Sequence, residues 1–219
     1  HAGHVDLDRL LGLPELKAEG DRLVLGAFTR FADLAASDVV RETLPALANL
    51  AAQVADRHVR NRGTIGGSLA NNDPAADAPA AMLALGATCV TDRRRLPAED
   101  FFQGLFTTGR DDDEILVSLE LPIPDAAAYA KHPHPASGYA VAGVFVARFG
   151  AEWRVGVTGS GNDGVFRLTS AEALLAQGAA LDDAALDINL DILFDDPSFP
   201  AEFRAAAIGW LLRDAVSRL

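Results

Sequence analysis

The sequence predicts a protein of the α+β class, and three observations support this. Stretches of alternating apolar and polar residues, typical of strands, lie between stretches with helical periodicity. Two β-rich segments that meet at Gly150 predict an antiparallel hairpin in the C-terminal part. The chain has 219 residues, of which 49% are hydrophobic, so it can build one large or two small domains.

The first elements are predicted from their periodicity. Residues 21–28 alternate and predict a strand. Helices are predicted over residues 31–37 and 45–56, the second because its apolar residues share one face. Pro45 suits the first turn of that helix, where no intrahelical partner for its missing N–H is needed.

A third helix is predicted over residues 74–85. Asp73 is expected to cap its N-terminus and Pro74 to occupy its first position, while Gly86 suits the C-terminal stop. Asp73 and Asp77 lie four residues apart, so on this helix they would share a face. Such a pair could act as acid and base, but a capping Asp73 and an Asp77 that accepts hydrogen bonds from ribose hydroxyls is the simpler interpretation.

The middle of the chain contains two further strands and two loops. Strands are predicted over residues 87–91 and 114–122. Residues 92–102 are expected to form a loop that leads into a short helical turn. Residues 123–137 are rich in proline and alanine, and we predict a linker there.

The C-terminal part is predicted to contain three strands followed by helices. The hairpin covers residues 139–149 and 151–161, and residues 165–176 predict a short strand and then a helix capped by Thr169 or Ser170. Residues 200–219 predict an amphipathic helix. Its expected core face consists of Phe203, Ala207, Trp210, Leu211 and Val216.

Charge and composition exclude some functions. The formal net charge of −12 opposes binding of a phosphate backbone, so nucleic acid is not expected as a partner. No apolar run reaches the roughly 18 to 20 residues that span a bilayer. The single cysteine, Cys89, lies in an apolar run and is expected to be buried; it cannot form an internal disulfide or hold an iron–sulfur cluster. We therefore expect a reducing compartment, the cytoplasm.

A glycine motif at residues 159–164 has the pattern G-x-G-x-x-G. A dinucleotide fingerprint needs a helix after this motif, but the following residues predict a strand. We therefore interpret the motif as a turn between antiparallel strands. The histidines His58, His132 and His134 are expected to be solvated rather than catalytic or metal ligands.

A second glycine segment has properties that suit an anion. No acidic residue occurs between Arg57 and Asn72, although the protein is acidic elsewhere. Glycines without a Cβ let an anion approach the backbone, successive N–H groups can form a nest, and hydroxyls add donors. The residues concerned are Arg57, Arg60, Arg62, Gly63, Thr64, Gly66, Gly67 and Ser68. The residues alone leave open a tight turn whose arginines pair with surface carboxylates.

Three motifs carry a resemblance to a known family. They are V-R-N-R-G-T-I-G-G-S-L-A-N-N-D-P-A-A-D at residues 59–77, F-F-Q-G-L-F-T-T at 101–108 and D-E-I-L at 113–116. Together they resemble the FAD-binding medium subunit of molybdenum hydroxylases. The resemblance is stronger to the carbon monoxide dehydrogenase medium subunit than to the flavin domain of xanthine dehydrogenase.

The resemblance implies a set of FAD-binding residues. The T-I-G-G turn of the family holds the FAD pyrophosphate, and its residues here are Thr64, Ile65, Gly66, Gly67 and Ser68. The family's aspartate that contacts FAD corresponds to Asp77, and its aliphatic residue beside the isoalloxazine corresponds to Leu116. A lysine after that strand corresponds to Lys131, and Tyr139 is placed near the ring system. No catalytic side chain and no metal ligand are implied for this chain.

The resemblance also implies the domain organisation. Residues 1–123 would form the second lobe of a two-lobed FAD-binding domain, a mixed sheet with helices. Residues 135–219 would form a C-terminal domain of a three-stranded antiparallel sheet plus helices. The family's first lobe, with its A-G-G loop, finds no match in the sequence, so this chain is expected to hold FAD weakly or not at all.

The implied function is that of an electron-transfer subunit. Electrons would come from 2Fe–2S clusters on a small partner subunit, supplied by a molybdenum cofactor on a large partner subunit, and would pass through FAD to an external acceptor. A non-catalytic assembly subunit of the same fold is the alternative from another class. A flavin oxidase of the berberine or vanillyl-alcohol type is disfavoured, because no large substrate domain fits after residue 137.

Overall fold

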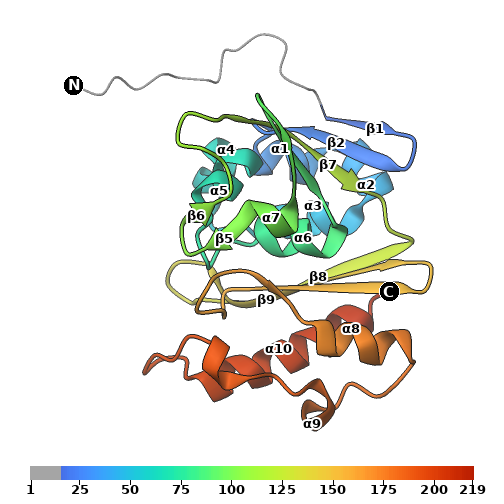
Figure 1. Cartoon of the computed structure of the whole chain (residues 1–219), viewed down its shortest axis with the longest axis vertical. Coiled ribbons are helices and arrows are strands. Elements are labelled where there is room, and N and C mark those ends of the chain that lie inside the picture. The colour runs from blue at the N-terminus through green and yellow to red at the C-terminus, as the bar shows by residue number, and fades with distance from the viewer. Residues whose placement is uncertain (1–15) are drawn as a thin grey trace.

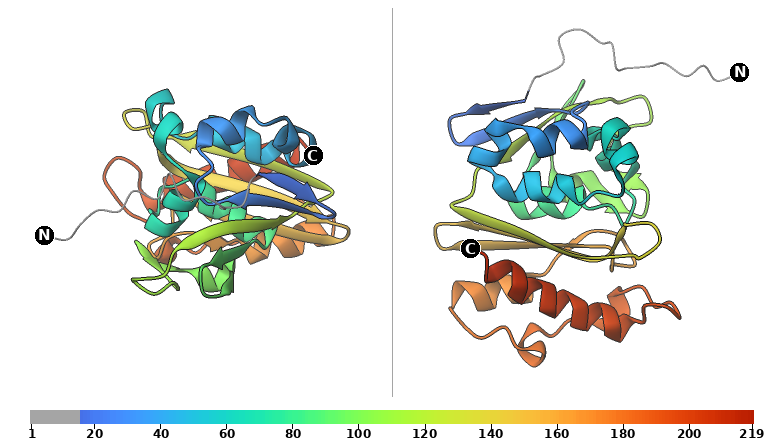
Figure 2. Two further views of the ribbon diagram at one scale, coloured as in Figure 1. Left: turned by 90° about the horizontal axis from the view of Figure 1, so that it is seen from above. Right: turned by 180° about the vertical axis from the view of Figure 1, so that it is seen from behind.

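The computed structural model describes residues 16–219, which form alternating layers of sheet and helix (Figure 1). A first sheet is followed by a layer of helices, then by a second sheet, and then by the C-terminal helices. The view from behind shows the same succession (Figure 2). The α+β class predicted from the sequence is confirmed.

The first sheet has five strands in the order β1-β2-β7-β3-β4. Each neighbouring pair is antiparallel, so the prediction of a mixed sheet in this part was wrong. The strands predicted over 21–28, 87–91 and 114–122 are confirmed with small shifts. The five strands are β1 (Lys17–Glu19), β2 (Arg22–Gly26), β3 (Thr88–Thr91), β4 (Arg95–Pro97) and β7 (Leu116–Pro122).

Helices follow β2 and separate the two sheets. The helices predicted over 31–37 and 45–56 are confirmed, and an unpredicted helix lies between them. These are α1 (Phe31–Ala36), α2 (Asp38–Thr43) and α3 (Pro45–Ala52). Between β4 and β7 lie α7 (Ala98–Phe101), β5 (Phe102–Gly104) and β6 (Thr107–Thr108).

The glycine segment is mostly helical, which corrects its interpretation as a turn. α4 (Arg57–Arg62) begins at Asp56, whose carboxylate accepts from two backbone N–H groups of the first turn. α5 (Ile65–Asn71) begins at Thr64, whose hydroxyl accepts from the backbone N–H of Gly67. The irregular link between the two helices is reduced to Gly63 and Thr64.

α6 (Ala78–Leu85) begins four residues later than predicted, with Asp77 at the N-cap position. Asp73 instead closes a turn, in which its carboxylate accepts from the N–H of Ala75 at 2.9 Å. The two aspartates therefore do not share a helix face, and the prediction that Asp73 caps this helix with Pro74 at its first position was wrong. Gly86 ends the helix with φ of 62°, as predicted.

The second sheet has four antiparallel strands in the order β11-β10-β9-β8. They are β8 (Ala126–Pro133), β9 (Ala140–Phe149), β10 (Glu152–Thr158) and β11 (Phe166–Arg167). The predicted hairpin is confirmed, and the glycine motif at 159–164 is a turn between antiparallel strands. The predicted linker was wrong over residues 126–133, since pairing with β9 turns an alanine-rich segment of low β-propensity into a strand.

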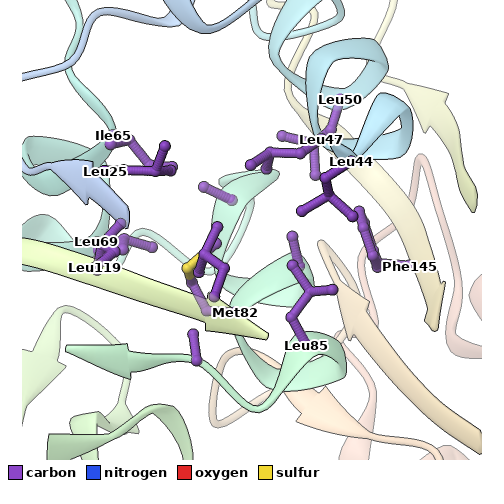
Figure 3. Close-up of a cluster of buried hydrophobic side chains, with 14 of the residues drawn as sticks. Leu25, Leu44, Leu47, Leu50, Ile65, Leu69, Met82, Leu85, Leu119 and Phe145 are labelled. Atoms are coloured by element: carbon purple, nitrogen blue, oxygen red, sulfur yellow. The ribbon is translucent and has the colours of Figure 1, made fainter. Parts of the chain in front are cut away.

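The second sheet is buried on both faces. Along β9, Phe145 and Ala147 belong to a core shared with the first sheet, while Val144 and Val146 belong to a core shared with the C-terminal helices. Successive residues of a strand point to opposite faces, so one strand serves both cores. Figure 3 shows the first core, with Phe145 opposite Leu44 and Leu47 of the helical layer. The division of the chain near residues 123–135 stays a prediction.

The C-terminal helices cover the outer face of the second sheet. They are α8 (Thr169–Ala176), α9 (Asp183–Leu186), the 3₁₀ turn η1 (Leu190–Ile192) and α10 (Ala201–Val216). The residue at the N-cap position of α8 is Leu168, which makes no side-chain cap, so the predicted cap by Thr169 or Ser170 was wrong. No helix within residues 16–219 has the length and apolar character needed to cross a membrane.

The predicted core face of α10 is confirmed for Leu211, Ala207 and Val216, which pack on the core, and was wrong for Phe203 and Trp210. Its buried face is formed by Ile208, Leu211, Leu212 and Ala215, while Trp210 is 59% exposed. Phe203 is also largely exposed and contacts the rings of Phe199 and His132. The two large aromatic residues therefore lie outside the core. The aliphatic residues Ile208, Leu211 and Leu212 of the same helix fill it instead.

Cys89 is buried in β3, as predicted. Burial in these apolar surroundings raises the pKa of its thiol to about 12, because the thiolate would be poorly solvated. The thiol is therefore protonated and unreactive at neutral pH.

Close contact between β10 and α6 makes Gly156 intolerant of a side chain. A Cβ at this position would lie 2.2 Å from the carbonyl oxygen of Ala80, which belongs to the helix backbone and cannot move aside. We expect Gly156→Ala to lower the free energy of unfolding by about 2 kcal/mol or more and Tm by roughly 4–8 °C. Thermal unfolding measures this change. As a control, Ala151→Val, at an exposed position of the same hairpin, should leave Tm within about 2 °C of that of the unmodified protein.

Candidate ligand-binding site

The start of α5 separates two neighbouring pockets. The first has a volume of about 370 Å³ and the second of about 410 Å³. Thr64 and Gly67 line both of them, so the two pockets adjoin at the first turn of this helix. A ligand that crosses this turn could occupy both.

The first pocket has a polar wall. It is formed by the segment between α4 and α5, by the loop before α6, and by residues near the C-terminal end of α3. Its polar residues are Arg62, Thr64, Ser68, Asn71, Asp73, Asp77 and Tyr139. It therefore offers hydrogen-bond donors, acceptors and one arginine to a ligand.

The second pocket is mainly apolar. Ala27, Phe28, Ala70, Ile115 and Leu116 line it, with Arg110 and the acidic residues 112–114 at one side. The residues after β2 and the first residue of β7 supply its walls, because β2 ends and β7 begins next to α5. This pocket suits a flat apolar ring system.

The backbone N–H groups of this turn are engaged within the protein. The N–H of Ile65 donates to Thr29 O at 2.9 Å, and that of Gly66 donates to Ala27 O at 2.8 Å. The N–H of Gly67 donates to the hydroxyl of Thr64 at 3.1 Å. A nest of successive free N–H groups was therefore the wrong picture for Ile65 and Gly66.

Gly66 and Gly67 lack a side chain for different structural reasons. A Cβ on Gly66 would lie 2.4 Å from the Cβ of Ala27, so this glycine lets α5 approach the end of β2. A Cβ on Gly67 would meet only the hydroxyl oxygen of Thr64, at 2.9 Å. Gly67 lines both pockets and is exposed, so it is the glycine that leaves space for a ligand.

Arginines of the segment are used in different ways. Arg60 donates to the carbonyl oxygens of Val54 and Ala55 at 2.8 and 3.1 Å, so it fastens α4 to the chain after α3. Arg62 lines the first pocket and supplies a positive charge there. The anion hypothesis therefore rests on Arg62 rather than on a group of three arginines.

Asp77 is 4% exposed and lines the first pocket. The Nζ of Lys131 is 2.8 Å from its Oδ1, and the hydroxyl of Tyr129 donates to the same oxygen at 2.5 Å. Lys131 also donates to Gln53 O at 3.0 Å. Burial raises the pKa of Asp77, while the Lys131 charge and both hydrogen bonds oppose that rise.

Most of the predicted site residues lie at the pockets. Thr64, Gly66, Gly67, Ser68, Asp77 and Leu116 line one or both of them, as does Tyr139. The side chain of Ile65 is instead buried in the core. Lys131 is 1% exposed and lies behind Asp77, outside the residues that line the two pockets.

Tyr129 was missed by the sequence analysis. It lies two residues before Lys131 on β8, so both side chains point to the same face of the sheet. That spacing was visible in the sequence, but it has meaning only once residues 126–133 are known to be a strand.

Glu114 supports one side of the second pocket. Its carboxylate accepts from Arg94 at 2.8 and 3.0 Å and from the hydroxyl of Thr91 at 2.5 Å. These hydrogen bonds, above all those from Arg94, lower the pKa of Glu114 to about 2. Within residues 16–219, no group of three or more His, Cys, Asp or Glu side chains is arranged to hold a metal ion.

Fold and pockets together define a class: an α+β protein with two adjoining pockets, one with a polar wall and one mainly apolar, suited to a ligand that has a polar and an apolar part. The family model described as "FAD binding domain in molybdopterin dehydrogenase" matches residues 1–124, which is more than half of the chain. The chain belongs to this family of FAD-binding domains. The predicted resemblance is thereby confirmed.

Relatives agree with this assignment. The carbon monoxide dehydrogenase medium chain of Afipia carboxidovorans is 32% identical, and the match covers 98% of this chain and 80% of the relative. The glyceraldehyde dehydrogenase medium chain of Sulfolobus acidocaldarius is 36% identical over 149 residues, which are 65% of this chain and 53% of the relative. The chain thus spans about half of one of these relatives and four fifths of the other.

Solved structures share the fold over nearly the whole chain. The CO dehydrogenase of Oligotropha carboxidovorans matches with a TM-score of 0.82 and 32% identity, covering 94% of this chain and 78% of the other. Quinoline 2-oxidoreductase of Pseudomonas putida 86 matches with a TM-score of 0.80 and 25% identity, covering 93% and 78%. The match includes the second sheet and the C-terminal helices, which lie beyond the residues of the family model.

Removing the charge of Lys131 should leave Asp77 buried without its counterion. We expect Lys131→Met to lower the free energy of unfolding at pH 7 by about 3 kcal/mol. An acid whose folded pKa lies above its unfolded value stabilises the fold as pH falls, so the deficit should shrink at pH 5. Urea unfolding at both pH values measures this, and the double variant with Asp77→Asn should recover part of the loss. An equal loss of unfolding free energy at both pH values would contradict the assignment of Lys131 as the counterion of Asp77.

Glu114 should make the protein sensitive to acid. Its folded pKa of about 2 lies below its ordinary value of 4.5, so its contribution to stability is complete above pH 4.5 and is lost as pH falls through 2. We expect Glu114→Gln to lower Tm at pH 6, with the difference from the unmodified protein disappearing towards pH 2. Glu152→Gln, on the exposed hairpin, serves as the control and should show no such convergence.

Proposed function

We propose that this chain is the FAD-binding medium subunit of a molybdenum hydroxylase. It would take electrons from iron–sulfur clusters on a small partner subunit and deliver them to an external acceptor. The observation that carries this proposal is the pair of adjoining pockets at the start of α5, one with a polar wall and one mainly apolar, in a chain of the FAD-binding family.

The residues of the two pockets fit FAD. A diphosphate suits the space that Gly67 leaves open, next to the hydroxyls of Thr64 and Ser68 and the charge of Arg62. Asp77 can accept hydrogen bonds from ligand hydroxyls in the polar pocket. Leu116 and its apolar neighbours would lie against the isoalloxazine in the second pocket.

The protein would supply binding and orientation, whereas FAD, when bound, supplies the redox chemistry. Gly66 and Ile65 contribute indirectly, because they fix α5 against β2 and the core. Lys131 contributes through Asp77. The apolar wall of the second pocket would exclude water from one side of the ring system.

The partners follow from the same proposal. A large subunit would hold the molybdenum cofactor, and a small subunit would hold 2Fe–2S clusters. The medium chains of carbon monoxide dehydrogenase and of glyceraldehyde dehydrogenase are similar to this chain by sequence. We place the complex in the cytoplasm, which suits a chain with one buried, protonated cysteine.

Titration of the purified chain with FAD tests the proposal directly. Quenching of flavin fluorescence and a shift of the absorbance band on saturation are the expected results. Of the two outcomes that the sequence leaves open, weak binding or none, we expect weak binding, so absence of both signals at millimolar FAD would overturn the proposal. ADP should compete if the polar pocket receives the nucleotide part.

Gly67 allows a matched test of the diphosphate position. Gly67→Asp would place a carboxylate between the two pockets, whereas Gly67→Asn adds a side chain of nearly the same size without charge. We expect the Asp variant to bind FAD at least tenfold more weakly than the Asn variant, because like charges repel in a partly dry site. Equal Kd values for the two variants would exclude a diphosphate near Gly67.

A further inference from the structure

Besides lining the pocket, the loop before α6 is fastened to the second sheet. Thr158 of β10 donates to Ala76 O at 2.6 Å and to Pro74 O at 3.2 Å, and Gly159 N donates to Pro74 O at 2.9 Å. Ala140 N donates to Ala75 O at 3.2 Å. This loop ends at Asp77, so the second sheet sets the position of the acidic residue in the first pocket.

Tyr129 has a particular place in this arrangement. Its side chain is buried, and its hydroxyl donates to Asp77 Oδ1 at 2.5 Å. A carboxylate offers about four lone-pair positions. Tyr129 contacts Oδ1 and Lys131 contacts both oxygens, so these two residues use only part of the acceptor capacity of Asp77, which lines the pocket.

We propose that Tyr129 is a positioning residue, which together with Lys131 holds the Asp77 carboxylate as an acceptor for ligand hydroxyl groups. This inference rests on the proposed function, since the hydroxyls are those of FAD. It assigns to the second sheet a direct part in building the cofactor pocket.

Gly143 supports this role. It lies on β9, opposite Lys131 in the strand register. A Cβ at this position would lie 2.6 Å from the hydroxyl oxygen of Tyr129 and 3.0 Å from Cγ2 of Thr158. The absence of a side chain at Gly143 therefore leaves room for the Tyr129 hydroxyl where it meets Asp77.

The first test is Tyr129→Phe, which keeps the buried ring and removes the hydroxyl. FAD affinity, measured by fluorescence quenching, should weaken about tenfold, as expected for one hydrogen bond to a charged group. Gly143→Ala should weaken it in the same direction by displacing the hydroxyl. An unchanged Kd in both variants would overturn the inference.

A pH profile separates positioning from packing. Lys131 and Tyr129 from β8 act on the pKa of Asp77, Lys131 also holds the Gln53 carbonyl, and the charged residues Arg62 and Asp73 line the same pocket. The Tyr129 hydrogen bond lowers the pKa of Asp77, so its removal raises that pKa. The loss of FAD affinity on acidification should therefore begin at higher pH in Tyr129→Phe. An unshifted profile would count against positioning.

Phe145→Leu is the matched control. Phe145 is paired with Tyr129 across the strands, with ring centroids 6.2 Å apart, and packs in the same core. We expect this variant to lower Tm but to leave the Kd for FAD unchanged. If it weakens FAD binding as much as Tyr129→Phe does, Tyr129 acts through packing and the inference is wrong.

The variant Asp77→Asn separates the positioning role of Tyr129 from the proposed function. If this variant weakens FAD binding and Tyr129→Phe does not, the positioning role fails and the proposed function stands. If the unmodified chain does not bind FAD, the proposed function fails and this inference fails with it.

Discussion

The interaction of Asp77 with Lys131 and Tyr129 of β8 is the one on which the rest of the structure depends. A carboxylate that is 4% exposed is held there by the ammonium group of Lys131 and the hydroxyl of Tyr129. A buried charge is costly without a partner, so the loop before α6 and the second sheet cannot separate without a large penalty. The same interaction positions Asp77 on one wall of the first pocket. The stability of the fold and the binding of a ligand in this pocket are therefore linked.

A second constraint is the shared use of the second sheet. Both of its faces are buried, one against α3 and α6 and the other against α8 and α10 (Figure 1). A substitution on β9 or β10 therefore affects two cores, and the close contact of Gly156 with Ala80 leaves no room for adjustment. The C-terminal part is thus a structural element of the pocket as well as a cover for the sheet.

Division of labour among the conspicuous glycines is a further point. Gly66 serves the approach of α5 to β2, whereas Gly67 keeps space between the pockets. Most of the backbone N–H groups that suggested an anion nest already donate to acceptors within the protein. Polar contacts to a ligand would therefore have to come from side-chain hydroxyls and Arg62. A ligand with a diphosphate between two dissimilar ends matches this distribution of groups.

The sequence by itself determined the α+β class, the hairpin around Gly150, the burial of Cys89 and the family, because these depend on local periodicity or on a continuous motif. It also located Thr64, Gly67, Ser68, Asp77 and Leu116, which line the pockets. Only the tertiary structure decided that residues 126–133 form a strand, that Phe203 and Trp210 lie outside the core, and that Tyr129 meets Asp77. These features depend on contacts between residues far apart in the chain, such as the 52 positions that separate Tyr129 from Asp77, and local sequence patterns do not contain such contacts.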